Sequence, residues 1–118
     1  MTSVTFETNV VAAGLEMLMH VSGHAEYTKD GPDIVCAAAS MLTQALAAAL
    51  VDLKPEKLPL IYTANEEAAE ACVWYLATDP LDYERAASMF AVARAGFEML
   101  AKNYPENVCV AGENPVKH

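Results

Sequence analysis

The sequence predicts an α+β domain in which two long helices pack on a mostly antiparallel sheet. Before Gly23, apolar residues alternate with polar ones, a pattern typical of half-buried strands. Apolar residues recur at helical spacing in two later segments, at about Asp33–Leu53 and Pro80–Tyr104. Each of these segments begins beside an aspartate that can cap a helix, so both helices have a defined start.

Length and composition limit the chain to one compact domain. Its 118 residues are enough for a single hydrophobic core and too few for two. With 54% apolar and 19% charged residues, it has the composition of a globular protein and not of a disordered one. We expect the domain to occupy residues 1–111 and the polar segment 112–118 to be a mobile tail.

The first two strands are predicted on either side of a chain reversal. Apolar and polar residues alternate over Val4–Thr8, and the reversal is expected at Asn9–Gly14. The second strand covers Leu15–Gly23 with the same period of two. Its apolar face carries Leu15, Met17, Met19 and Val21.

A loop and a capped helix start follow the second strand. The loop is expected over Ala25–Pro32, because Gly31-Pro32 is a strong breaker of regular structure. Asp33 is the natural N-cap of the helix. Its carboxylate is expected to accept hydrogen bonds from the N–H groups of Val35 or Cys36.

The first helix is rich in alanine and carries no charge over Ile34–Val51. Its polar residues make this run only weakly apolar, so we interpret it as a buried helix of a soluble domain and not as a membrane span. It should end near Leu53, before Lys54-Pro55. The residues expected to face the core are Val35, Ala38, Leu42, Ala45, Leu46, Ala49 and Leu50.

The middle of the chain is less decisive. Leu58–Thr63 has strand propensity, and Pro59 within it indicates an edge position in the sheet. The segment Ala64–Ala77 fits two structures, because Asn65 and the glutamates after it suit a helix start whereas Cys72–Leu76 suits a strand. From the residues alone, both alternatives stay open.

The second helix has the clearest pattern. Asp79-Pro80 combines an N-cap with proline at the first helical position, and Tyr104-Pro105 ends the helix. On its solvated face, Glu98 precedes Lys102 in the favourable orientation. Asn107–Ala111 is a candidate for a last edge strand. The core stripe of the helix comprises Ala86, Phe90, Ala93, Phe97, Leu100 and Tyr104.

His24 and Cys36 are the candidate catalytic residues. His24 follows the second strand, Cys36 falls in the first turn of the helix, and only a short loop separates them. Unpaired N–H groups and the helix dipole make a thiol there easier to ionise, and the thiolate is the reactive form. A thiolate and an imidazole suffice for nucleophilic acyl transfer, with the free N–H groups of the same turn expected to hold the oxyanion.

Each of these residues also has a purely structural interpretation. Cys36 would then be an inert residue of an alanine-rich helix and His24 an ordinary loop residue. Asp33 would place a carboxylate near the thiol and hinder its ionisation, and a Cys36 N–H capped by Asp33 would be lost to the oxyanion. We therefore interpret Asp33 as structural support. Ser40 lies one turn beyond Cys36 on the same helix face, where it either lines the site or permits close packing.

The residues around this pair resemble a family signature. Gly23-His24-Ala25, followed by Gly31-x-Asp33-Ile34-Val35-Cys36-Ala37-Ala38-x-Ser40, is similar to the central motif of the ribosomal-processing cysteine protease family, Prp. Weaker similarity continues at Leu53–Glu56, at Tyr104-Pro105 and at Val108–Val110.

The resemblance implies a site and a function. His24 and Cys36 would be the catalytic dyad, with Gly23, Asp33 and Ser40 in supporting positions. The protein would be a small dimeric endopeptidase that removes a short N-terminal extension from a large-subunit ribosomal protein. Some phage-encoded relatives process capsid-assembly proteins instead.

The resemblance also favours one structure for the open segment. It implies a hairpin with a strand at about Ala71–Ala77, which gives the order ββαββα with a possible final edge strand. The sequence departs from the family pattern at two positions, with Glu26 where the family often has Gly and Ala39 where it often has Val. Glu26 is expected to stiffen or recharge the loop that admits the substrate, which affects the choice of substrate more than the chemistry.

Charge and cysteine content indicate the kind of partner and the cellular compartment. The net charge of −9 disfavours direct nucleic-acid binding and would attract a basic protein partner. Three cysteines, an odd number without close pairs, and the lack of a signal peptide predict a cytoplasmic protein. The sequence has no glycine-rich phosphate loop and no CxxC pair, so we expect neither cofactor nor metal.

Two alternatives to a protease remain. The first is a catalytically silent, dimeric assembly or binding factor on the same fold, in which Cys36 would react no faster than Cys72 and Cys109. The second is a metal-binding regulator, which would contain zinc.

Overall fold

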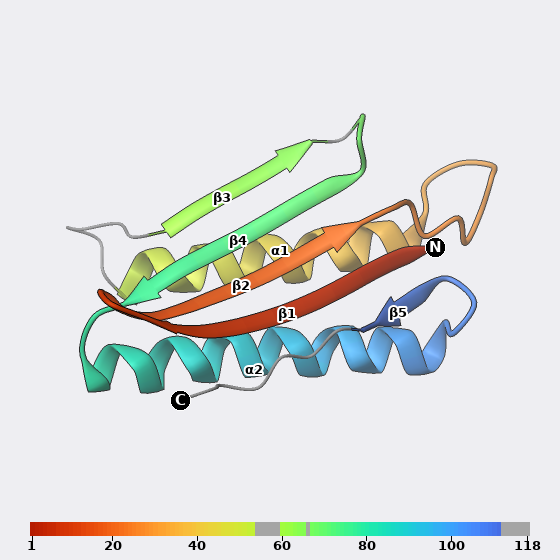
Figure 1. Ribbon diagram of the computed structural model, residues 1–118. Helices are drawn as coiled ribbons and strands as arrows, with labels where there is room; N and C mark the ends of the chain where they lie inside the picture. The colour runs from red at the N-terminus through yellow and green to blue at the C-terminus, as the bar shows by residue number, and fades with distance from the viewer. Residues whose placement is uncertain (54–59, 66, 112–118) are drawn as a thin grey trace.

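The structure is a computed structural model that describes residues 1–53, 60–65 and 67–111 (Figure 1). Its elements confirm the predicted order of two strands, a helix, two strands, a helix and a final short strand. The predictions for Lys54-Pro55, for Leu58-Pro59 and for the tail at 112–118 fall outside the described residues. The elements are β1 (Thr2–Val11), β2 (Gly14–Ser22), α1 (Ile34–Leu53), β3 (Leu60–Asn65), β4 (Glu70–Ala77), α2 (Pro80–Asn103) and β5 (Val108–Val110).

The five strands form one sheet in the order β3-β4-β2-β1-β5. Neighbouring strands are antiparallel except for β1 and β5, which are parallel. The two helices contact each other and pack on the same face of the sheet (Figure 1). β3 is an edge strand, as Pro59 indicated, and β4 settles the open segment in favour of the hairpin.

The prediction for the first chain reversal was wrong in its extent. β1 continues to Val11, which pairs with Gly14, and only Ala12 and Ala13 form the turn. A side chain at Gly14 would collide with the backbone carbonyl of Ala77, and its φ of 152° is unfavourable for other residues. Val10 and Val11, which were expected in the reversal, belong to the strand instead, in keeping with their β propensity.

The core lies between the helical layer and one face of the sheet. The alternation predicted for β2 is confirmed, because Met17, Met19 and Val21 are buried. The predicted inner face of α1 was only partly right, since the helix is rotated so that Ala39, Thr43 and Ala47 are buried in addition to the expected Val35, Leu46 and Leu50. The buried residues of α1 are Val35, Ala39, Thr43, Leu46, Ala47 and Leu50.

α2 follows the prediction closely. Asp79 caps the helix by accepting a hydrogen bond from the N–H of Asp82 at 2.9 Å, and Pro80 is its first residue. Glu98 forms an ion pair with Arg94, one turn earlier, at 3.4 Å, and not with Lys102, which the sequence had suggested as its partner. Residues of the predicted stripe that are buried are Ala86, Phe90, Ala93 and Phe97.

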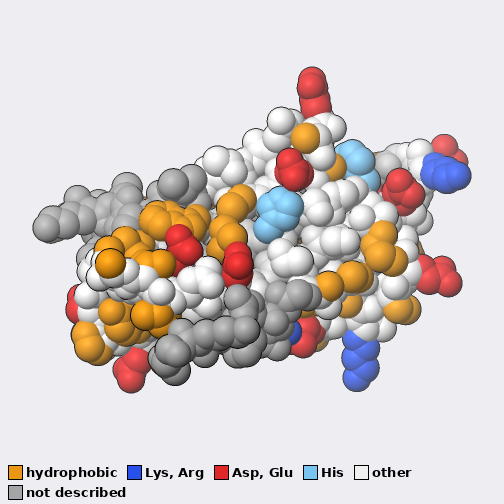
Figure 2. Space-filling view, viewed as in Figure 1, with side chains coloured by type: hydrophobic (Ala, Val, Ile, Leu, Met, Phe, Trp, Pro, Cys, Tyr) orange, Lys and Arg blue, Asp and Glu red, His pale blue; other side chains and the backbone are white. Residues whose placement is uncertain are grey.

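By length and composition alone, α1 could cross a membrane. The core helices of soluble proteins pass the same test. Here α1 packs against α2 and against the strands β3 and β4. The face of the molecule seen in Figure 2 carries more acidic than basic side chains, in keeping with the net charge of −9.

A buried hydrogen bond joins β4 to the start of α2. The hydroxyl of Tyr75 donates to Oδ1 of Asp82 at 2.7 Å. Burial, helped by this bond and by the nearby charges of Asp82 and Asp79, raises the pKa of Tyr75 far above its ordinary value. The phenol therefore stays a donor over the whole working pH range.

We expect Tyr75→Phe to lower the free energy of unfolding by about 1–3 kcal/mol, because the buried carboxylate of Asp82 loses one of its hydrogen-bond donors. Urea unfolding followed by circular dichroism measures this change. Tyr75 does not line the candidate active site, so the alkylation rate of Cys36 should stay at its wild-type value. A variant as stable as the wild type would show that this bond makes no net contribution.

Candidate active site

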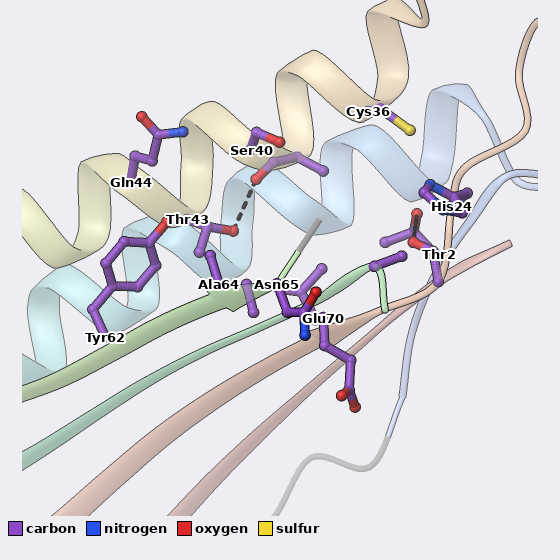
Figure 3. Close-up of a pocket in the computed structure, with 15 residues that line it drawn as sticks. Thr2, His24, Cys36, Ser40, Thr43, Gln44, Tyr62, Ala64, Asn65 and Glu70 are labelled. Atoms are coloured by element: carbon purple, nitrogen blue, oxygen red, sulfur yellow. Dashed lines mark hydrogen bonds between the residues drawn. The ribbon is translucent and has the colours of Figure 1, made fainter. Parts of the chain in front are cut away.

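A cavity of about 310 Å³ opens beside the end of β2, between α1 and the β3–β4 hairpin (Figure 3). Four of the five predicted site residues line it: Gly23, His24, Cys36 and Ser40. Its opposite wall includes Tyr62, Ala64, Asn65 and Ala69. The cavity therefore has a reactive end near Cys36 and a neutral end near Tyr62.

Gly23 turns the chain from β2 into the loop that carries His24. Its φ of 89° lies in the region that favours glycine, and a Cβ there would collide with the backbone carbonyl of Met1. His24 follows on the surface with an exposed side chain. The geometry at Gly23 thus fixes where His24 leaves the sheet.

Cys36 lies in the first turn of α1, half-buried. Its Sγ accepts a hydrogen bond from the backbone N–H of Ala25 at 3.4 Å. In Figure 3 the sulfur points toward His24. The residue after His24 therefore contacts the sulfur directly through its backbone N–H.

Asp33 lies beside the cavity and holds two segments together. Its Oδ1 accepts hydrogen bonds from the N–H groups of Val35 at 2.9 Å and Cys36 at 3.0 Å, which confirms the predicted N-cap. Its Oδ2 accepts from the N–H groups of Tyr27 at 2.9 Å and Thr28 at 3.4 Å. One carboxylate therefore ties the loop to the start of α1.

These bonds correct the expectation for the oxyanion. The N–H groups of Val35 and Cys36 are taken by the carboxylate of Asp33, and that of Ala37 by the backbone carbonyl of Asp33. These three N–H groups are already hydrogen-bonded within the start of α1 and are therefore not free to bind the oxyanion. The backbone N–H directed at the sulfur belongs instead to Ala25.

The pKa of Asp33 lies below its ordinary value. Burial alone would raise the pKa of this carboxyl, but the four backbone N–H groups that donate to it outweigh that effect. A carboxyl with a lowered pKa stabilises the folded state above its ordinary pKa, and the stabilisation is lost as the pH falls through the lowered value. The tie between loop and helix is therefore intact at neutral pH.

Asp33→Ala should lower the free energy of unfolding by about 0.5–2 kcal/mol at pH 7, as loss of an N-cap does. The difference between variant and wild type should shrink as the pH falls below about 4, the ordinary range of an aspartate. Urea unfolding of both proteins from pH 7 to pH 3 measures it. A difference that stays constant over this range would mean that the charge of Asp33 has no role.

The backbone at Glu26 explains why the family often has glycine at this position. Its φ is 57°, in the left-handed region where glycine is favoured. A glutamate there bears backbone strain that a glycine would not. Tyr27 and Lys29 of the same loop do not line the cavity. The ring of Tyr27 packs edge-on against that of Tyr104, with the ring centroids 5.0 Å apart.

Sequence reasoning missed several residues that surround the site. Tyr62 and Gln44 line the far end of the cavity, and Thr2 lines its reactive end. These positions are far apart in the sequence and belong to no short motif, so only the topology brings them together. In the part of the chain that the structure describes, no three His, Cys, Asp or Glu side chains are grouped so that they could hold a metal ion.

A thiol at a helix start and an imidazole on the same cavity, on a one-sided α+β sheet, form the arrangement expected of a small cysteine protease. The family model described as cysteine protease Prp matches residues 1–109. The chain therefore belongs to the Prp family of cysteine proteases. As a member of this family it is a peptide hydrolase.

Solved structures share the fold. SMU.848 from Streptococcus mutans is 28% identical with a TM-score of 0.68, over 97% of this chain and 96% of that one. The S. aureus ribosomal processing protease Prp, solved in complex with a substrate peptide and with a covalently linked product peptide, is 19% identical with a TM-score of 0.67. That alignment covers 94% of this chain and 99% of that one. No curated protein matches the chain.

Proposed function

We propose that this protease removes a short N-terminal extension from a large-subunit ribosomal protein, with Cys36 as nucleophile and His24 as general base and then acid. The observation that carries the proposal is that both side chains line one cavity while the N–H of Ala25 is directed at the sulfur. Membership of the Prp family supports the reaction class. The name of the S. aureus structure, a ribosomal processing protease, supports the substrate class.

In the first half of the reaction, His24 takes the proton of Cys36 and the thiolate attacks the carbonyl carbon of the scissile peptide. A carbon–sulfur bond forms and the carbonyl oxygen becomes an oxyanion. The N–H of Ala25 already lies 3.4 Å from the sulfur, so it is well placed to turn toward this oxygen once sulfur has lost its charge. The carbon–nitrogen bond then breaks, and protonated His24 gives its proton to the leaving amine.

In the second half, His24 takes a proton from a water molecule, which attacks the thioester. The carbon–sulfur bond breaks, the peptide leaves as a carboxylic acid, and the proton returns to the sulfur of Cys36. Asp33 takes no part in these proton transfers. Its role is to keep the loop after His24 fixed against the first turn of α1.

The shape and charge of the molecule suit an extended peptide from a basic protein. The cavity runs from Cys36 along α1 past Ser40 to Gln44 and Tyr62, whose side chains are neutral (Figure 3). Steering would come from the net charge of −9 over the whole molecule, because the tails of ribosomal proteins are commonly basic. Phage structural proteins are the second candidate substrate class.

We also propose that the protein works in the cytoplasm as a homodimer, without metal or cofactor. The three cysteines of the described chain are free thiols, which suits a reducing compartment. Both helices cover the same face of the sheet, so the other face is available to a second copy. Size-exclusion chromatography with light scattering tests the dimer.

The test of the substrate is incubation of the purified protein with a ribosomal protein that retains its N-terminal extension, followed by mass spectrometry. A single cut by the wild type, absent with Cys36→Ala, is the expected result. A cut in a phage structural protein only would change the substrate class and keep the chemistry. No cut, with Cys36 no more reactive than Cys72 and Cys109, would favour the catalytically silent binding factor.

A further inference from the structure

Among the described residues, no side chain forms a hydrogen bond with either ring nitrogen of His24. The imidazole is also exposed. In hydrolases that use a histidine base, a third group commonly holds the ring in its working orientation. Here the ring must instead take its position from the backbone that carries it.

That backbone is held on both sides of His24 by side chains from elsewhere in the chain. The carbonyl of Gly23, in the peptide before His24, accepts a hydrogen bond from the hydroxyl of Thr2 at 2.9 Å. The carbonyl of Ala25, in the peptide that joins Ala25 to Glu26, accepts a hydrogen bond from Nδ2 of Asn107 at 3.0 Å. The peptide between them carries the N–H that is directed at the catalytic sulfur.

The two donors are themselves connected. The N–H of Thr2 donates to the backbone carbonyl of Asn107 at 2.8 Å, and Thr2 pairs with Val108 in the parallel β1–β5 ladder. Thr2 is 2% exposed and Val108 is 1% exposed, so this connection lies in the protein interior. We call Thr2 and Asn107 with these bonds the Thr2–Asn107 clamp.

We propose that Thr2 and Asn107 are positioning residues for catalysis, which set the place of the His24 ring and of the Ala25 N–H relative to Cys36. This inference rests on the proposed roles of His24 and Cys36. Neither clamp residue exchanges a proton with the substrate. Their loss should therefore slow the chemical step through misplacement of the reacting groups and leave binding of the peptide largely unchanged.

The variants are chosen to remove a single donor while keeping shape. Thr2→Val loses the hydroxyl, Thr2→Ser keeps it, and Asn107→Asp replaces the donating amide by a carboxylate that cannot donate at neutral pH. Asn9→Ala is the matched control, because the Nδ2 of Asn9 donates to Glu16 at the opposite end of β1 and β2. Melting temperatures establish that all four variants are folded.

Thr2→Val and Asn107→Asp should each lower kcat for peptide cleavage roughly 10- to 100-fold with KM changed less than about threefold. Thr2→Ser should restore kcat, and Asn9→Ala should leave it unchanged. A second readout needs no substrate: the pH profile of Cys36 alkylation should move in Thr2→Val, which adds no charge, toward that of His24→Ala. A clamp with a merely structural role would not move this profile.

The outcomes separate this inference from the proposed function. If His24→Ala is impaired while Thr2→Val and Asn107→Asp keep wild-type kcat and alkylation profiles, the clamp is overturned and the dyad stands. If Thr2→Ser fails to rescue kcat, the hydroxyl is not what matters and the clamp is likewise overturned. If His24→Ala itself cleaves and alkylates like the wild type, both the dyad and the clamp fall.

Discussion

Cys36→Ala is expected to lower kcat/KM for peptide cleavage by at least ~10³-fold, because the nucleophile that forms the thioester is removed. His24→Ala should cost ~10²- to 10⁴-fold, the usual contribution of a general acid and base. Initial rates with a fluorogenic peptide measure both effects. Because the two residues act as a unit, the double variant should be scarcely slower than Cys36→Ala alone.

The other two cysteines provide matched controls. Cys72 lies in β4 opposite His20 of β2, and its pKa is raised by burial. Cys109 lies in β5, and neither residue lines the cavity. Cys72→Ala and Cys109→Ala should keep rates within about twofold of the wild type, as substitutions away from the reacting groups do. Loss of activity in either variant, with Cys36→Ala still active, would show that the nucleophile has been assigned to the wrong cysteine.

Gly23→Ala should be strongly damaging although Gly23 lies outside the dyad. A left-handed backbone costs a non-glycine residue about 1–3 kcal/mol, and here the new Cβ would also meet the backbone of Met1. The start of β1 would have to move, and with it Thr2, which holds the carbonyl of Gly23. We therefore expect a loss of more than about 2 kcal/mol of unfolding free energy, together with loss of cleavage.

Gly31 provides a control for the cost of the left-handed backbone without a steric clash. Its φ is 79°, close to that of Gly23, but no atom lies within 4 Å of an added Cβ. Gly31→Ala should thus cost only the left-handed strain, about 1–2 kcal/mol. Urea unfolding compares the two variants. Equal losses for Gly23→Ala and Gly31→Ala would mean that the contact with Met1 has no energetic consequence.

The sequence predicted best the elements that have strong local signals. α2 combines Asp79-Pro80 with a regular apolar stripe, so both its start and its buried face could be predicted. For α1, only the bounds could be predicted from the sequence. The helix is apolar nearly all round, so its periodicity does not distinguish Ala38 from Ala39 as the buried residue. Its inner face is set by the sheet and α2, which a local pattern does not contain.

The turns show a second kind of limit. The β1–β2 turn consists of Ala12 and Ala13, which carry none of the usual turn signals, so the prediction placed the end of the strand too early. Ala69 and Glu26 adopt positive φ without being glycine. Strain of this kind is imposed by tertiary structure and leaves no mark in residue type.

The candidate site divides in the same way. His24, Cys36 and the capping Asp33 belong to one short stretch whose motif and helix start could be read directly. Thr2 and Asn107 reach the same place from near the two ends of the described chain. Such long-range contacts depend on the sheet order, in which β1 lies between β2 and β5.

The most direct test of the central claim is the rate at which each cysteine is alkylated by iodoacetamide from pH 5 to pH 9, followed by peptide mass spectrometry. A dyad predicts that Cys36 reacts much faster than Cys72 and Cys109 at neutral pH, and that His24→Ala removes this advantage. Equal rates for the three cysteines, unchanged by His24→Ala, would contradict the assignment of Cys36 and His24 as the catalytic pair.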